Sequence, residues 1–104
     1  MISKEMYRII VTEMIKHKSN LCGGYNEDFL NSNDFVVMMY LIGILDCENF
    51  KEIKSSRIAD IIEMKKSDVK DSIDRLTKLK ILIESKEEFN FGFKIGTSFN
   101  DINE

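Results

Sequence analysis

The 104-residue sequence contains no proline and no tryptophan, and it has only two cysteines and one histidine. Without proline, the turns must rest on glycine, asparagine, aspartate and serine. The cysteines, Cys22 and Cys47, have no histidine beside them and no zinc-ligand spacing. We therefore expect two reduced, partly buried thiols, no metal site and no cofactor.

Long apolar stretches and an export signal are lacking as well. The longest apolar run, residues 35–45, is too short to cross a bilayer and predicts a buried helix. Charged residues follow Met1 almost at once, which argues against a signal peptide. We therefore expect a cytoplasmic protein with no membrane contact. We also expect a single domain, because a chain of this length can bury one core.

The sequence offers little for catalysis. His17 is the only histidine, and it stands in a polar stretch beside Lys16 and Lys18, where we expect it to be exposed. The acidic residues lie at the spacings of helix surfaces and form no pair suited to acid–base chemistry. The Cys-Gly-Gly stretch at 22–24 lacks the following lysine and hydroxyl residue of a phosphate-binding loop. We therefore predict no enzymatic activity and no catalytic residues.

Charge is distributed unevenly along this chain of net charge -3. Residues 21–50 carry five acidic residues and no lysine or arginine, whereas residues 51–80 carry nine basic and six acidic residues. Such segregation can create a basic face on an acidic protein. Charge alone leaves two interpretations equal, a nucleic-acid-binding face and a merely solvated surface.

Hydrophobic periodicity predicts the secondary structure of the middle of the chain. Val69, Ile73 and Leu76 recur at helical spacing and form a predicted buried stripe, which Leu79 extends. The predicted elements are a core helix at about 34–46 capped by Ser32 or Asn33, a short strand at 50–53, a helix from 57 to about 64 capped by Ser55 or Ser56, and a helix at 68–80 capped by Ser67.

A β-hairpin is predicted to follow, with strands at 81–85 and 89–95 and a turn at 86–88. Alternate residues of a strand share one face. The second strand therefore places on one face Phe89, Phe91, Phe93 and Ile95. We interpret this stripe as core-facing rather than as a platform for stacking bases.

The two ends of the chain are less clearly patterned. Residues 4–16 fit either an amphipathic helix, through Met6, Ile9, Ile10 and Met14, or a strand, through a run rich in β-branched residues. Residues 18–33 form a predicted turn-rich connection. We divide the domain into an N-terminal extension and loop at 1–32, a main body at 33–97 and a flexible tail at 98–104.

The order helix, short strand, helix, helix, hairpin resembles the winged helix-turn-helix superfamily. The resemblance covers roughly residues 33–97 and is carried by 55–83, where a short helix containing Ile58-Ala59 precedes a Val-x-x-x-Ile-x-x-Leu helix and a Leu-Ile strand. It implies an α+β fold in which a three-helix core carries a C-terminal β-hairpin wing. Lys80 departs from the pattern, because the family often has a helix-ending glycine there, and this predicts a less sharply turned entry into the hairpin.

The resemblance implies binding of double-stranded DNA, with the second helix of the pair facing the major groove. Asp71 and Asp74 on that helix are unfavourable next to phosphates, so we expect the wing and the N-terminal basic residues to share the contact. The expected DNA-binding residues are Lys66, Ser67, Lys70 and Arg75 on the helix, Lys86, Asn90 and Lys94 on the hairpin, and Lys4 and Arg8 near the N-terminus.

A narrower resemblance is to small winged-helix proteins of plasmids from low-GC Gram-positive bacteria, including origin-of-transfer-binding conjugation accessory proteins of clostridial plasmids. It implies an accessory role in conjugation, with a relaxase or another DNA-processing protein as partner. Replication-initiator domains are also similar, and a transcriptional regulator or a winged-helix module that binds only protein stays open. We expect a homodimer, with the N-terminal segment as its interface.

Overall fold

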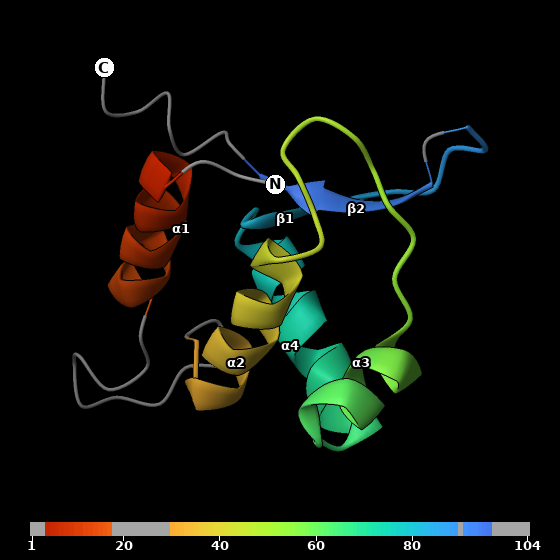
Figure 1. Cartoon of the computed structure of the whole chain (residues 1–104), viewed down its shortest axis with the longest axis horizontal. Coiled ribbons are helices and arrows are strands. Elements are labelled where there is room, and N and C mark those ends of the chain that lie inside the picture. Colours follow the sequence, from red (N-terminus) through yellow and green to blue (C-terminus); the bar gives the residue numbers. More distant parts are fainter. Residues whose placement is uncertain (1–3, 18–29, 90, 97–104) are drawn as a thin grey trace.

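The computed structural model describes residues 4–17, 30–89 and 91–96, which form a small α+β fold (Figure 1). Four helices precede one two-stranded antiparallel hairpin in these ranges. The elements are α1 (Lys4–Lys16), α2 (Ser32–Ile42), α3 (Ser55–Ile62), α4 (Lys66–Lys78), β1 (Leu82–Ser85) and β2 (Gly92–Ile95). This architecture is compatible with the expected three-helix core and wing. The predicted flexible tail at 98–104 lies outside the described residues, as does most of the predicted loop.

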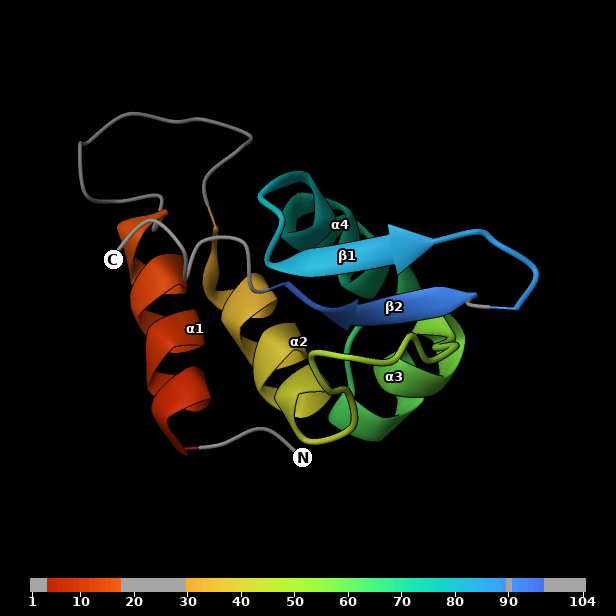
Figure 2. The same ribbon diagram turned by 90° about the horizontal axis from the view of Figure 1, so that it is seen from above.

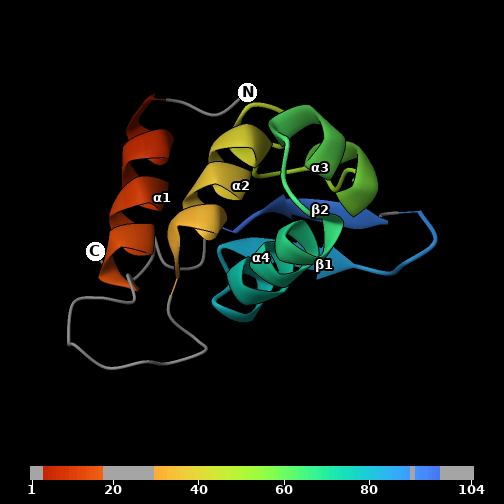
Figure 3. The ribbon, with the colours of Figure 1, turned by 90° about the horizontal axis from the view of Figure 1, so that it is seen from below.

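The helices α2, α3 and α4 pack together, and α1 lies beside this group. Figures 1 and 3 show α1 alongside α2, with α3 and α4 on the other side of α2. Figure 2 shows the hairpin lying across one end of this arrangement, and the connection between its strands extends beyond the helices. The hairpin connection and α1 therefore lie at opposite ends of the molecule.

The predicted stripe on α4 is confirmed as the centre of the core. Val69, Ile73 and Leu76 are buried, and α4 packs against both α2 and α3. The small side chain of Ala59 is buried in the same cluster, where two helices come together. Burial of the stripe fixes the rotation of α4 about its axis, and so decides which of its residues face solvent.

The N-terminal segment is a helix, which settles the alternative that the sequence left open. Ile10 and Met14, one helical turn apart, are fully or almost fully buried in the common core. The β-branched run does not prevent this, because tertiary packing of an apolar stripe outweighs the small intrinsic preference for strand.

The predicted serine caps are wrong. Asn31 caps α2, accepting from the Asp34 N–H at 3.2 Å, while the Asp34 carboxylate accepts from the Asn31 N–H at 2.9 Å. The N-caps of α3 and α4 are Lys54 and Lys65, and neither makes a side-chain cap. The serines lie inside the first turns instead, so the predicted starts were late. The helix predicted to reach residue 46 ends at Ile42.

The strand predictions also need correction. The predicted strand at 50–53 is reduced to one bridge, in which Lys51 and Phe93 exchange backbone hydrogen bonds of 2.8 Å. β2 begins only at Gly92, whose φ of 124° favours glycine and where a β-carbon would collide with the Lys51 carbonyl. Pairing stops there, at Ser85 opposite Gly92, so the hairpin is shorter than predicted.

The shorter hairpin overturns the predicted core-facing phenylalanine stripe. Ile95 is fully buried and Phe93 packs against the core, but Phe89 is 91% exposed and Phe91 is 51% exposed. Strand alternation keeps side chains on one face only while the strand continues. The two exposed rings lie before β2, where that constraint no longer acts.

The chain turns sharply into the hairpin although no glycine is present. Lys80 adopts the left-handed conformation with φ of 65°, and the Ile81 N–H donates to the Leu76 carbonyl at 3.0 Å. The expected gentler entry is therefore wrong. A side chain in this conformation costs about 1 kcal/mol or more, which the surrounding hydrogen bonds offset.

An ion pair joins the start of α2 to the last third of α4. The Arg75 Nε and Nη2 atoms donate to the two carboxylate oxygens of Asp34, at 2.8 and 2.7 Å. The Asp34 side chain is fully buried and that of Arg75 is 24% exposed. Arg75 was expected to contact DNA, but this two-bond contact directs its guanidinium toward α2.

The Asp34–Arg75 pair predicts a strong energetic coupling. Arg75→Met and Asp34→Ala should each lower the free energy of unfolding by about 3 kcal/mol, because each leaves a poorly solvated charge without its partner. The double variant should lose clearly less than the sum. Urea denaturation of the four proteins measures this, and additive losses would contradict the coupling.

The conformation of Lys80 predicts an unusual gain from glycine. Lys80→Gly should raise the free energy of unfolding by about 0.5 to 1 kcal/mol, because glycine adopts a positive φ without strain. Lys70→Gly, an exposed position inside α4, should lower it by about 1 kcal/mol and is the matched control. Thermal and urea denaturation compare the two, and a loss of stability in both would show that Lys80 is unstrained.

Candidate nucleic-acid interface

All the candidate residues predicted on α4, except Arg75, lie on its exposed side. Lys66, Ser67 and Lys70 are exposed and lie on the first half of the helix. Asp71 and Asp74 are exposed farther along the same helix. Asp68 in the first turn is only half exposed, so the outer face of α4 is basic at its N-terminal end and acidic toward its middle. Only the N-terminal end suits a polyanion.

The N-terminus of α4 adds a feature that sequence reasoning missed. Lys65 is the N-cap residue, it is exposed, and its side chain does not cap the helix. The first N–H groups of a helix have no partner within the helix and carry partial positive charge. Together with Lys66 and Ser67, they favour a phosphate at this position. The adjacent Lys65-Lys66 pair was the available signal, but only Lys66 was counted with the helix.

The hairpin brings together fewer of the candidate DNA-binding residues than predicted. Lys86 is exposed on the connection between the strands. Lys94 is half-buried on β2, and its Nζ lies 4.9 Å from the centroid of the Phe50 ring, so it packs against the loop before α3. Asn90 lies outside the described residues. The connection therefore offers one described cation next to the exposed rings of Phe89 and Phe91.

The N-terminal candidates lie apart from α4. Lys4 and Arg8 are exposed on α1, which Figures 1 and 3 place on the far side of α2. Arg8 makes a long, exposed ion pair with Glu5 at 3.9 Å. The structure does not bring these two residues together with Lys66 and Lys70 on a common surface.

The surroundings of His17 and Cys47 are explained by neighbouring residues. His17 is half-buried rather than exposed, and its Nε2 lies 3.2 Å from Oε2 of Glu13, one turn earlier. Burial raises the pKa of the Cys47 thiol, with the charges of Asp46 and Glu48 adding to the effect. Such a thiol is a poor nucleophile at neutral pH. In the described ranges, no three metal-ligating side chains are grouped.

Comparison with known proteins adds no family assignment. No protein-family model, curated protein or solved structure matches this chain. Among the helices described, none combines the length and hydrophobicity that crossing a bilayer requires.

Proposed function

We propose that this chain is a cytoplasmic, non-enzymatic, double-stranded DNA-binding protein of the winged helix-turn-helix type. One observation carries the proposal: the N-terminal end of α4 and its N-cap residue present Lys65, Lys66, Ser67 and Lys70 to solvent, while the opposite face of the helix is held in the core. A rigid helix with a basic, uncapped N-terminus is the kind of element that enters a major groove and contacts its phosphates.

The acidic residues of α4 restrict how the helix docks. Asp71 and Asp74 follow Lys70 along the helix, and a carboxylate placed near phosphates is repelled by them. The helix therefore enters the groove with its N-terminal end and not along its whole length. Lys65 and Lys66 contact phosphates, and Ser67 and Lys70 lie nearest the base edges.

The hairpin supplies the second contact. Lys86 is followed on the same connection by the exposed rings of Phe89 and Phe91. A cation beside exposed apolar side chains is the chemistry with which proteins enter a minor groove and wedge a base step. The neighbouring Glu87 and Glu88 are exposed as well, so the aromatic rings, rather than net charge, supply this contact.

A homodimer would double this contact area. Tyr7, Val36 and Met39 are large apolar residues that remain more than a third exposed, and the Tyr7 hydroxyl lies 3.2 Å from the Met39 sulfur. α1 and α2 therefore share one exposed apolar patch, and α1 lies at the opposite end of the molecule from the hairpin connection (Figure 2). Pairing through this patch leaves α4 and the hairpin of each copy free for DNA. The same patch favours the second candidate function, a winged-helix module that binds a protein partner such as a relaxase.

The biological setting follows from the resemblance noted above, which favours an origin-of-transfer-binding accessory protein of a plasmid. A transcriptional regulator or a replication initiator would use the same DNA-binding step. The three roles differ in the sequence they recognise, so sequencing of the fragments that the protein retains from a plasmid and genomic library separates them.

Docking through α4 predicts a salt-dependent interaction lost on charge reversal. Binding to a labelled mixed-sequence duplex, measured by fluorescence anisotropy, should weaken with log salt at a slope of about -5 if about six phosphates are neutralised. The double variant Lys66→Glu/Lys70→Glu should abolish binding. Lys16→Glu/Lys54→Glu changes the net charge equally and is the matched control, because neither of these exposed residues is expected to contact DNA. Equal losses in both variants, or no binding at low salt, would contradict docking through α4.

The apolar patch on α1 and α2 predicts self-association. Sedimentation velocity of the wild-type chain should show a dimer, and Met39→Glu should shift it to monomer, because a buried carboxylate without a partner is costly. Ile61→Glu changes an equally exposed apolar residue on α3 and should leave the dimer intact. A monomeric wild type, or dissociation in both variants, would show that the patch is not the interface.

A further inference from the structure

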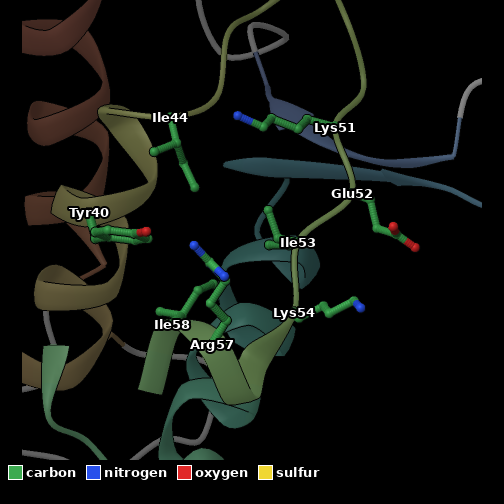
Figure 4. Close-up of a pocket in the computed structure, with 8 residues that line it drawn as sticks. All are labelled: Tyr40, Ile44, Lys51, Glu52, Ile53, Lys54, Arg57 and Ile58. Atoms are coloured by element: carbon green, nitrogen blue, oxygen red, sulfur yellow. The ribbon is translucent and has the colours of Figure 1, made fainter. Parts of the chain in front are cut away.

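An open pocket of about 450 Å³ lies between the end of α2, the segment 51–54 and the start of α3 (Figure 4). Ile44, Ile53 and Ile58 form its apolar wall. Ile58 is almost completely buried, whereas the other two are partly buried against the core. The volume lies within the usual range for sites that bind small molecules, roughly 300 to 1,000 Å³.

Two cations converge on this pocket. Figure 4 shows the amino group of Lys51 and the guanidinium of Arg57 directed into it, with the Tyr40 hydroxyl pointing toward Arg57. The side chains of Glu52 and Lys54 point away from it in the same view. The interior of the pocket therefore holds two positive groups and a hydroxyl beside an apolar wall, with no carboxylate between them.

The two cations have no acidic partner inside the described part of the chain. The ion pairs there involve Arg8, Lys16, His17 and Arg75, and neither Lys51 nor Arg57 is among them. The chain has more acidic than basic residues, so a lack of available carboxylates does not explain this. Both side chains are exposed at the pocket, and an anion bound between them would be attracted by both charges.

The pocket is separate from the proposed DNA-binding face. It is lined by α2, α3 and the segment between them, and α4 lies behind it in Figure 4. α4 turns its buried stripe toward α2 and α3, so its exposed basic residues face away from this pocket. A duplex docked on α4 would leave the pocket open.

We propose that this pocket binds a small organic anion, in which a carboxylate or phosphate head is joined to an apolar body about the size of an aromatic ring. The head lies between Lys51 and Arg57 and accepts a hydrogen bond from the Tyr40 hydroxyl, since charge-assisted bonds of this kind are the strong ones. The apolar body covers the isoleucine wall. The proposal does not depend on DNA binding.

The ligand chemistry is tested by titrating the ¹⁵N-labelled full-length chain and following its amide resonances. The probes are phenyl phosphate, benzoate, inorganic phosphate and benzyl alcohol. Phenyl phosphate or benzoate should shift the resonances of Tyr40, Ile44 and residues 51–58 in a saturable way. Inorganic phosphate and benzyl alcohol, which lack the body and the head respectively, should each bind about tenfold more weakly. Equal responses to all four probes, or shifts elsewhere only, would overturn the proposal.

The residues are tested with three charge-neutralising variants. Arg57→Gln and Lys51→Gln should each weaken binding of the better aromatic anion about tenfold, because each removes a charge-assisted hydrogen bond. Lys54→Gln removes the same charge from a side chain that points away and should leave the affinity within about twofold. Equal effects in all three would show diffuse attraction rather than a site. Displacement of the anion by a DNA duplex would assign the pocket to the nucleic acid and overturn the proposal as well.

Discussion

The contact between Asp34 and Arg75 organises the rest of the structure. The Asp34 carboxylate completes the N-terminal cap of α2 through the Asn31 N–H and also receives two hydrogen bonds from Arg75 of α4. It thereby ties the start of one helix to the side of another, across 41 residues of chain. Because a buried carboxylate is tolerated only when its oxygens are satisfied, this geometry permits little rotation of α4. The direction in which Lys66 and Lys70 point is a consequence.

This packing gives the basic residues of segment 51–80 three different roles. Arg75 is used internally, Lys66 and Lys70 stand on the outer face of α4, and Lys51 and Arg57 turn into a pocket on the other side of the core. Local excess charge therefore does not form one continuous basic face. It forms two separate basic sites, and this separation is why we propose one macromolecular and one small anionic ligand.

Sequence reasoning succeeded where a single physical rule dominated. The stripe of Val69, Ile73 and Leu76 is buried as predicted, because helical periodicity determines which side chains can share a core. It failed where several alternative helix caps or strand lengths have similar free energies. Ser55 and Ser67 are good capping residues, yet Lys54 and Lys65 occupy the N-cap positions of α3 and α4. In α2, Asn31 is the N-cap because the Asp34 side chain accepts a hydrogen bond from its backbone N–H. The exposed rings of Phe89 and Phe91 show the same weakness, since alternation predicts a face only while the strand persists.

The sequence by itself determined the class of fold, the order of the three helices α2 to α4 with the hairpin after them, and the core face of α4, because these depend on hydrophobic periodicity along a continuous stretch of chain. It also identified the lysines on the first half of α4. Only the tertiary structure decided that Arg75 belongs to an internal ion pair, that residues 4–16 are helical and that Tyr40, Lys51 and Arg57 surround one pocket. These outcomes depend on contacts between residues distant in the chain, and no local pattern encodes such contacts.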